Sequence, residues 1–262
     1  MSRESEFSLK KNIAAIITVR LNSSRLKKKA LKKINNLISI QILIKRLKKL
    51  NNISNIVLAT APHKNLFELQ KICKKEKINF FVGSEKNVLK RIIQCATKFK
   101  IDNVIRITGD DIFRDIVNLD QAILSHKKNN KDITIMKNIP YGLDSEIFNL
   151  DVLKIIDKKH NKKCDSSYLS WFIDRRIFNV NNFDCKYSNY ENIIVTLDYK
   201  IDLTIMRFIH KNLGTYFTTE KLIGFYKKNK KKFLSFKTLR KKIESQFDKS
   251  HHPSRKDYKL II

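Results

Sequence analysis

The 262-residue sequence is poor in glycine, histidine motifs and paired cysteines, and these shortages exclude several kinds of protein. No two of the four cysteines have CxxC spacing, so a zinc ribbon or a thioredoxin-type pair is not indicated, and we expect Cys73 and Cys95 to be packed core thiols. The histidines form no HExxH pair, and no GxSxG nucleophile motif is present. The glycines fit neither a GxGxxG dinucleotide fingerprint nor a GxxxxGK[ST] phosphate loop, because the five of them are Gly83, Gly109, Gly142, Gly214 and Gly224.

Long apolar runs are also missing. A membrane helix needs about 20 apolar residues, whereas one of the most apolar stretches, Ile13–Val19, has only the length of a strand. The first residues, MSRESEFSLKKN, lack the apolar core of a secretory signal. The 42% hydrophobic content excludes a wholly disordered chain. We therefore expect a cytoplasmic protein with no membrane partner.

Acidic residues are scarce as well, since 55 Lys and Arg against 25 Asp and Glu give a net charge of +30. Such a balance often indicates nucleic acid or an anionic membrane surface. Only twelve of these cations are arginine, and the lysines are spread along the whole chain among Asn and Ile. We interpret most of them as solvated faces and expect no nucleic-acid partner. An RNA- or membrane-associated basic protein remains an alternative, which a steep salt dependence of polymer binding would support.

Short apolar runs alternate with amphipathic segments in the first half of the chain. The expected strands are Ile13–Val19, Asn55–Thr60, Asn79–Val82 and Asn103–Thr108, with Asp132–Met136 extended. The expected helices are Ile38–Leu50, Leu66–Lys77, Asn87–Phe99 and Asn118–Lys128. This alternation predicts an α/β fold with a mostly parallel central sheet flanked by helices. Ligands of such sheets bind beyond the carboxyl ends of the strands, which places the site in the loops after the strands.

The segments after residue 139 are shorter and less regular. We expect strand or loop at Tyr141–Phe148, Phe178–Val180 and Glu191–Thr196, and helices at Asp151–Lys159, Ser166–Ile173, Asp202–Asn212 and Thr219–Lys228. The Lys-rich residues 226–262 suggest a loose tail. With no Pro/Gly/Ser-rich linker and no internal repeat, one domain with an elaborated second half is the simplest description.

The loop after the first strand, within the polar stretch Leu21–Ile34, carries the best candidates for anion binding. Arg20 and Arg25 stand five residues apart, two adjacent serines lie between them, and Lys29 follows four residues later. Arginines make bidentate contacts to phosphate oxygens, and hydroxyl and backbone N–H groups fill the gaps. A basic surface loop is the alternative in so lysine-rich a chain. Its position after the first strand of an α/β pattern favours a triphosphate site.

At these residues the sequence resembles the cytidylyltransferases. Ile13–Ala30 is similar to their nucleotide-binding loop, R-x-x-S-[ST]-R-L-P-x-K, and the likeness is greatest to the spore-coat-polysaccharide-biosynthesis type, related to the enzymes that make CMP-sialic acid and CMP-Kdo. Further similar stretches follow in order at Phe81–Arg91, Arg106–Asp110, Gly142–Phe148 and, more loosely, Val195–Leu203. The resemblance implies a Rossmann-like nucleotide-diphospho-sugar transferase fold over residues 11–236. Its nucleotide-binding half would be 11–138 and its acceptor half 139–236, between an N-terminal extension (1–10) and a basic tail (237–262).

The same resemblance implies a CTP-dependent nucleotidyltransferase that transfers CMP to an anionic sugar or related small acid or phosphate for surface glycans. It assigns catalytic roles to Arg20, Arg25, Lys29 and Asp110. It places Asp144 and Glu146 at the acceptor, although an ordinary hairpin edge is equally consistent with them. The nucleotide contacts that it implies are Arg20, Leu21, Asn22, Ser23, Ser24, Arg25, Lys29, Thr60, Gly83, Ser84, Glu85, Arg91, Thr108 and Gly109.

Magnesium is the expected cofactor, because it neutralises phosphate charge and prefers one or two carboxylates together with phosphate oxygens and water. Asp110 follows a strand directly, and Asp198 ends an apolar run, so these two are the candidate ligands. A turn or helix cap is the alternative role for Asp110 and its neighbour Asp111. For Asp198 a purely structural role also remains open.

The sequence departs from the family pattern at several positions. Lys27-Lys28 replaces a Pro-Gly pair, and Asn22 stands where glycine is frequent. Ala61-Pro62 lacks an acidic residue, and a His-containing segment has become 164–167, CDSS. These changes leave the acceptor open. They also keep a second hypothesis, a non-catalytic nucleotide-binding scaffold in a glycan pathway. The oligomeric state is open too, with a homodimer as one option.

Overall fold

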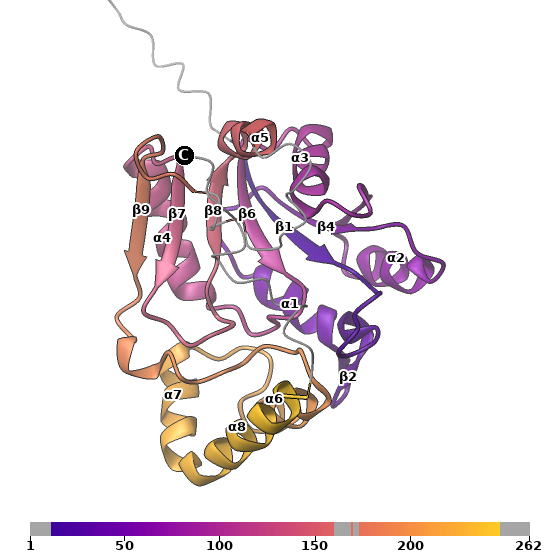
Figure 1. The fold of residues 1–262 in the computed structure, drawn as a ribbon, viewed down its shortest axis with the longest axis vertical. Helices are drawn as coiled ribbons and strands as arrows, with labels where there is room; N and C mark the ends of the chain where they lie inside the picture. The colour runs from indigo at the N-terminus through magenta and orange to yellow at the C-terminus, as the bar shows by residue number, and fades with distance from the viewer. Residues whose placement is uncertain (1–11, 160–168, 170–172, 247–262) are drawn as a thin grey trace, which may run out of the picture.

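A seven-stranded sheet organises the described part of the chain, residues 12–159, 169 and 173–246, in this computed structural model (Figure 1). The strand order is β5-β4-β1-β6-β8-β7-β9, and neighbouring strands are parallel except that β8 is antiparallel to both β6 and β7. The mostly parallel sheet expected from the sequence is therefore confirmed. The strands are β1 (Ile13–Val19), β4 (Asn55–Thr60), β5 (Asn79–Val82), β6 (Asn103–Thr108), β7 (Ile133–Lys137), β8 (Glu146–Asn149) and β9 (Val180–Asp184), beside a small hairpin of β2 (Lys33–Ile34) and β3 (Leu37–Ile38).

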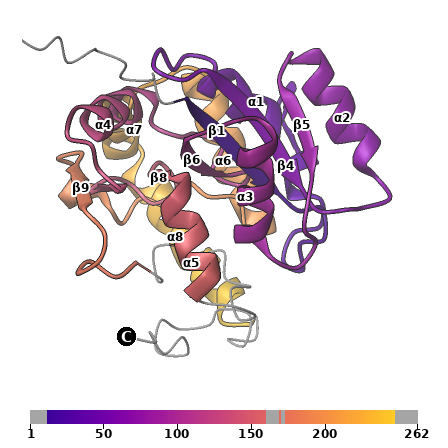
Figure 2. The same cartoon turned by 90° about the horizontal axis from the view of Figure 1, so that it is seen from above.

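Helices cover both faces of the sheet, which explains why its central strands are continuous apolar runs. On one face lie α1 (Ser39–Leu47), α2 (Leu66–Lys75) and α4 (Ile116–Lys128), and on the other α3 (Val88–Lys98) and α5 (Leu150–Lys159) (Figure 2). Successive side chains of a strand point to opposite faces. Accordingly Ile17 of β1 belongs to the first apolar cluster and Ile16 to the second, and both are fully buried.

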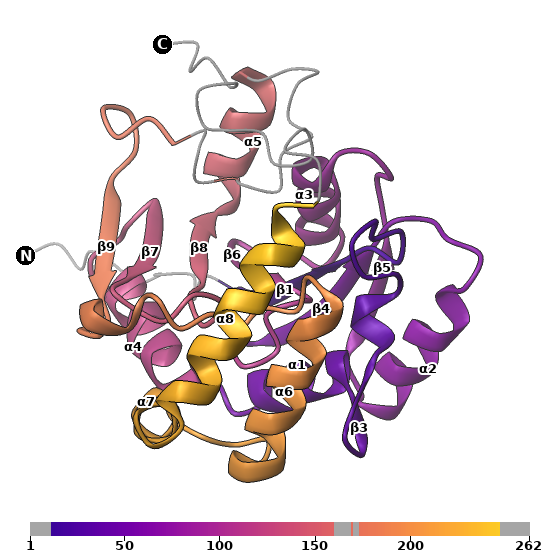
Figure 3. The same ribbon diagram turned by 60° about the horizontal axis from the view of Figure 1, so that its bottom comes forward.

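Three further helices lie beyond the carboxyl ends of the strands: α6 (Lys200–Leu213), α7 (Thr219–Lys228) and α8 (Lys230–Glu244) (Figures 1 and 3). They pack through aromatic rings, with the Phe225 centroid 5.0 Å from that of Phe208 and 6.1 Å from that of Phe233. For residues 230–244 of the expected loose tail the structure gives a different result, because helix α8 buries Phe233 and Arg240 against the rest of the fold; residues 247–262 lie outside the described residues. The domain boundary expected at residue 236 falls inside this helix.

A few other expectations differ from the structure. The polar stretch after β1 contains a short 3-10 helix, η1 (Lys29–Leu31), in addition to β2. Residues 191–196 form no named strand and contribute one isolated bridge between Ile194 and Tyr141, after the 3-10 helix η3 (Ser188–Tyr190). Several expectations fall outside the described residues: the 164–167 departure and both termini. Of the helix expected at 166–173, only residues 169 and 173 are described.

Cys73, Cys95 and Cys185 are buried free thiols, as expected for the first two, and burial raises the pKa of each to about 12. Of the helices in the described residues, none has the length and apolar character required to cross a membrane.

Candidate active site

One cleft at the carboxyl ends of β1 and β6 gathers most of the charged residues that the sequence singles out. Its volume is about 280 Å³, and its walls also include the loop after β1, the start of β8 and the segment before α6. Parallel strands end at the same edge of a sheet, so residues distant in sequence meet there. The sequence-predicted residues that line it are Arg20, Arg25, Lys29, Arg91, Thr108, Gly109, Asp110, Asp144, Glu146 and Asp198.

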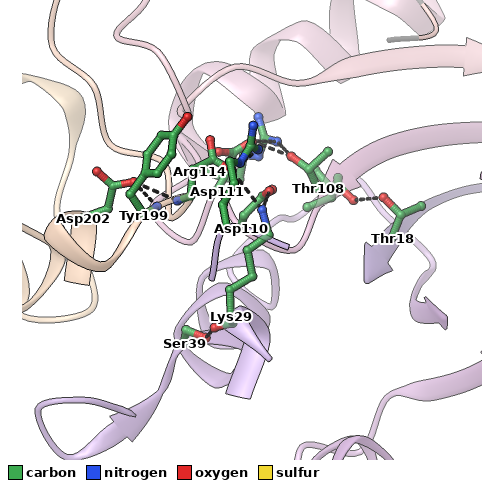
Figure 4. A network of polar contacts seen from close by, with 12 residues as sticks. Thr18, Lys29, Ser39, Thr108, Asp110, Asp111, Arg114, Tyr199 and Asp202 are labelled. Atoms are coloured by element: carbon green, nitrogen blue, oxygen red, sulfur yellow. Dashed lines mark hydrogen bonds and ion pairs between the residues drawn. The ribbon is translucent and has the colours of Figure 1, made fainter. Parts of the chain in front are cut away.

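The loop after β1 is held in place by buried anchors between its charged side chains. Leu21 and Leu26 are buried, so the intervening backbone cannot swing free of the sheet. At its end the hydroxyl of Ser39, in the first turn of α1, donates to the carbonyl oxygens of Lys29 and Ala30 at 2.8 and 2.7 Å. Figure 4 shows Lys29 reaching from this support to the carboxylate of Asp110. The side chain of Lys29 is therefore aimed into the cleft by its fixed backbone.

Lys28 occupies the place where the cytidylyltransferase pattern usually has glycine, and the structure gives the physical reason. Its backbone is in the left-handed region, with φ 52° and ψ 39°. Its N–H donates to the carbonyl oxygen of Leu21 at 3.3 Å, which closes the loop. Glycine takes this conformation freely, whereas another residue loses about 1–2 kcal/mol. The loop therefore keeps its path despite the substitution.

Two carboxylates that line the cleft, Asp110 and Asp198, form a network of ion pairs with three cations. The ammonium of Lys29 contacts Asp110 and lies 3.0 Å from Oδ1 of Asp198. The guanidinium of Arg25 is 2.9 Å from the same Asp198 oxygen, and Arg240 of α8 is 3.5 Å from the other. Because Asp110 follows β6 and Asp198 precedes α6, the network joins both halves of the fold at Lys29.

This network perturbs the pKa values of its members. Burial opposes the charged form of both Lys29 and Asp198. For Asp198, the attraction of Lys29 and Arg25 outweighs burial and lowers its pKa to about 2. For Lys29, the attraction of Asp110 and Asp198 outweighs burial and raises its pKa. Both groups are therefore charged throughout the physiological pH range.

A second polar cluster lies at the end of β6 (Figure 4). The guanidinium of Arg114 donates to Asp111 at 2.7 Å and to the hydroxyl of Thr108, and it lies 3.8 Å from Asp144. Burial raises the pKa of Asp111 to about 7, because the pull of Arg114 is opposed by the nearby carboxylates of Asp110 and Asp144. The cluster ties the segment after β6 to the segment before β8.

The start of β8 supplies the opposite wall. Glu146 faces Arg106 across the β6–β8 pair, and their side chains form a 2.7 Å ion pair. Between Asp144 and Glu146 the hydroxyl of Ser145 is buried and has no hydrogen-bond partner among the described residues. Both acidic residues expected at the acceptor thus line the cleft, although Glu146 is already paired.

Gly109 allows the ends of β1 and β6 to come close together. A Cβ atom there would lie 2.6 Å from Cγ2 of Val19 and 3.2 Å from the carbonyl oxygen of Thr18. A larger residue would therefore require the side chain of Val19 or the strand ends to shift. This is the role that the structure gives to the glycine of the Thr108-Gly109-Asp110 stretch.

Arg91 connects the cleft with the loop after β5. It lines the cleft, and its guanidinium donates to the carbonyl oxygens of Ser84 and Glu85 at 2.8 and 3.0 Å. Burial and the proximity of Arg20 lower its pKa. Gly83 and Ser84 line a separate, shallower hollow beside α3. The loop is therefore held at the rim of the cleft by Arg91 rather than lining its interior.

The other residues implied for nucleotide binding do not line the cleft with the arginines. Leu21, Ser23 and Thr60 are buried, and Asn22 and Ser24 are exposed on the loop. The hydroxyl of Thr60 donates to the carbonyl oxygen of Ala61, so it is turned back to the chain.

Sequence reasoning missed several charged or polar residues of the site: Arg106, Asp111, Arg114, Ser145 and Arg240. Arg106 and Ser145 lie inside stretches that resemble the family, so their position was a usable signal. Arg240 had none, because it follows the region of resemblance and lies in a segment that looked like a lysine-rich tail.

Comparison with known proteins agrees with this geometry. A family model described as cytidylyltransferase matches residues 14–246. The uncharacterized protein MJ1063 of Methanocaldococcus jannaschii is 31% identical over 189 residues, 71% of this chain and 78% of that protein. The spore coat polysaccharide biosynthesis protein SpsF of Bacillus subtilis is 32% identical over 146 residues, 54% of this chain and 61% of that protein.

Solved structures show the same fold. A cytidylyltransferase from Leptospira borgpetersenii serovar Hardjo-bovis superposes with a TM-score of 0.76 at 21% identity, covering 84% of this chain and 95% of that one. A CMP:2-keto-3-deoxy-manno-octonic acid synthetase complexed with CTP gives a TM-score of 0.61 at 14% identity, over 77% of this chain and 99% of that one. The expected nucleotide-diphospho-sugar transferase fold is thus confirmed. Because the family model spans nearly all of the described residues, the chain belongs to the cytidylyltransferase family and is a CTP-dependent nucleotidyltransferase.

Proposed function

We propose that the protein transfers CMP from CTP to an anionic sugar, or to a related small acid or phosphate, and releases pyrophosphate. The observation that carries this proposal is the convergence in one cleft of Arg20, Arg25 and Lys29 with the carboxylates of Asp110 and Asp198. Cations from one loop suit a triphosphate, since they neutralise charge on the oxygens of the departing pyrophosphate.

Magnesium is the metal we propose for this site, and the donor set fits it. Carboxylate oxygens of Asp110 and Asp198 both reach a single cationic atom, the Nζ of Lys29. Across the described residues, no three His, Cys, Asp or Glu side chains come together as a ligand set. Two carboxylates suffice for Mg²⁺ when phosphate oxygens and water complete the shell. When bound, the metal supplies charge neutralisation for the phosphates.

The chain's own residues divide into two ends of the cleft. We assign Arg20, Arg25 and Lys29 to the triphosphate, because all three come from the loop after β1 and line the cleft. The loop at Gly83–Glu85, held by Arg91, would border the nucleoside.

The opposite end would orient the acceptor. Asp144, Ser145 and Glu146 line that wall, and the buried hydroxyl of Ser145 is available to a hydroxyl or carboxylate of the acceptor. The likeness to SpsF, a protein named for spore coat polysaccharide biosynthesis, supports a role in surface glycans. A nonulosonic acid or a sugar phosphate is the class of acceptor we favour.

Pyrophosphate release tests this proposal. The purified protein is incubated with CTP and Mg²⁺ and a panel of nonulosonic acids and sugar phosphates, beside ATP, GTP and UTP as alternative donors. We expect CTP-dependent release with at least one acceptor. Asp110→Ala is expected to abolish it, whereas Asp151→Asn, at an exposed carboxylate outside the cleft, is expected to leave it unchanged.

Two outcomes would contradict the proposal. Failure of CTP to bind would remove its basis altogether. Binding of CTP without turnover of any acceptor, together with a pathway partner bound equally by the wild type and Asp110→Ala, would indicate the non-catalytic scaffold instead.

A further inference from the structure

The orientation of Asp198 depends on a buried carboxylate one helical turn further along the chain. Asp202, in the first turn of α6, accepts hydrogen bonds at Oδ2 from the backbone N–H groups of Asp198 and Tyr199, both at 2.8 Å. Asp202 is 1% exposed. These two bonds define the path of the chain at the point where Asp198 turns its carboxylate into the cleft.

The charge of Asp202 is balanced from a distant helix. The Nε of Arg240, on α8, donates to Oδ1 of Asp202 at 3.2 Å, and its terminal nitrogen lies 3.5 Å from Oδ2 of Asp198. Arg240 is itself buried, with 5% of its surface exposed. One guanidinium therefore contacts both the carboxylate of the cleft and the carboxylate that shapes its loop.

The two oxygens of Asp198 have different partners as a result. Oδ1 faces Lys29 and Arg25 in the cleft, and Oδ2 faces Arg240 behind it. The ring of Tyr199 lies close to both guanidinium groups. Its centroid is 4.9 Å from Cζ of Arg240 and 5.4 Å from Cζ of Arg25. Figure 4 shows Tyr199 and Asp202 side by side next to the cluster of cleft residues. Aromatic rings accept such cations on their faces, which fixes the side chains further.

From this arrangement we propose that Arg240 is a positioning residue for the nucleotidyl transfer, acting through Asp202 and Asp198, and that α8 is part of the catalytic apparatus. This inference rests on the proposed function. It adds a residue from the segment that the sequence presents as a basic tail. In this role Arg240 holds Oδ2 of Asp198, so that Oδ1 faces the cleft.

The physical reason is the cost of an isolated buried charge. Without Arg240, Asp202 would be a buried carboxylate lacking its counter-charge, which proteins avoid by local rearrangement. Such a rearrangement weakens the two hydrogen bonds that hold the backbone of Asp198 and Tyr199. Partners behind a metal-binding carboxylate typically contribute about 10- to 100-fold to metal affinity or activity.

Three variants test the proposal. Arg240→Gln removes the charge, and Arg240→Lys keeps it. Lys241→Gln is the matched control, because it removes one positive charge from the adjacent, exposed position of the same helix. Each variant is examined by hydrogen–deuterium exchange, by Mn²⁺ affinity in the presence of CTP measured by electron paramagnetic resonance, and by steady-state turnover.

For Arg240→Gln we expect the Asp198 and Tyr199 amides to exchange about tenfold faster and the affinity for Mn²⁺, measured in the presence of CTP, to fall about tenfold. We expect kcat to fall about tenfold or more while KM for CTP changes by less than about threefold, since the cations that hold the triphosphate are intact. Arg240→Lys is expected to recover most of each loss, and Lys241→Gln to resemble the wild type.

A double-mutant cycle separates positioning from general destabilisation. In the Asp198→Asn background, Arg240→Gln is expected to cause no further loss of Mn²⁺–CTP affinity, because its effect passes through the Asp198 carboxylate. If the double variant instead loses affinity by the product of the two single losses, the inference is overturned. Wild-type exchange, affinity and kcat in Arg240→Gln would overturn it too.

The proposed function and this inference fail in different ways. If the wild type binds Mn²⁺–CTP and turns over but Arg240→Gln is unaffected, only the inference is refuted. If the wild type binds without any turnover, the proposed transfer is refuted, and the exchange and affinity data still decide whether Arg240 positions Asp198. If the wild type binds no CTP, both are refuted.

Discussion

Asp198 is the carboxylate that contacts three cations, so Asp198→Asn is a direct test of the electrostatics of the cleft. A carboxylate that binds metal in a cluster of other acids is often destabilising, and its removal then stabilises the fold. Here Arg25, Lys29 and Arg240 all lie within 3.5 Å of Asp198. We therefore expect the opposite sign, a loss of stability on removing the charge.

The size of this loss follows from the pKa. Burial opposes ionisation of Asp198, but Lys29 and Arg25 lower its pKa to about 2, from an ordinary value of 3.8. A depressed carboxyl pKa stabilises the folded state fully above the ordinary value and ceases to do so as pH falls toward the folded one. At about 1.4 kcal/mol per pKa unit, the contribution is about 2–3 kcal/mol at neutral pH.

Urea unfolding followed by circular dichroism at pH 7, 5, 4 and 3 measures this contribution of Asp198 to stability. The difference in unfolding free energy between the wild type and Asp198→Asn is expected to be nearly constant from pH 7 to 5 and to shrink from pH 4 to pH 3. The control Asp151→Asn removes an exposed carboxylate paired with Lys154 at i+3 and is expected to change stability by less than about 0.5 kcal/mol. If Asp198→Asn proves as stable as the wild type at pH 7, the cations do not stabilise this carboxylate and the reasoning is wrong.

Three other perturbations probe separate features. Gly142→Ala is expected to lower the free energy of unfolding by about 2–3 kcal/mol in urea titrations. The reason is that φ of Gly142 is +95° and a Cβ atom would lie 2.9 Å from the backbone of Val195. An unchanged urea midpoint would contradict this expectation. Burial lowers the pKa of His210, so the unfolded chain binds the proton more readily and the free energy of unfolding falls as pH drops below 6.5. His210→Gln is expected to flatten that part of the profile of stability against pH. Parallel profiles for the wild type and the variant would argue against this role of His210. Lys29→Met is expected to reduce pyrophosphate release about 100-fold, since one cation is lost beside the phosphates, and turnover near the wild-type rate would exclude that role.

The first half of the sheet was predictable because its signals are local. The strands Ile13–Val19, Asn55–Thr60, Asn79–Val82 and Asn103–Thr108 have the bounds expected from their apolar runs. The charged loop after the first of them was predictable too, since a ligand site at the carboxyl end of β1 requires only the α/β alternation.

The remaining features depend on contacts that no local pattern records. The Arg106–Glu146 pair exists because β8 enters the sheet antiparallel to β6, which the sequence does not reveal. Helix α8 was missed because its buried stripe includes Arg240 where an apolar residue would have signalled a helix face. Thr60 was expected at the nucleotide, but its side chain is buried and bonded to its neighbour, a detail set by packing.

The reversed direction of β8 has a consequence for how such enzymes can diversify. One wall of the cleft is built from strand exits, at Val19 and Thr108, and the other from a strand entrance, at Glu146. Between Lys137 and Glu146 the chain therefore runs beside the cleft as a connection outside the seven-stranded sheet, bridged at Tyr141 to Ile194. Changes of length or sequence in this connection can remodel one wall while the hydrogen-bond register of β4, β1 and β6 is untouched, so one side of the cleft can change shape without rebuilding the other.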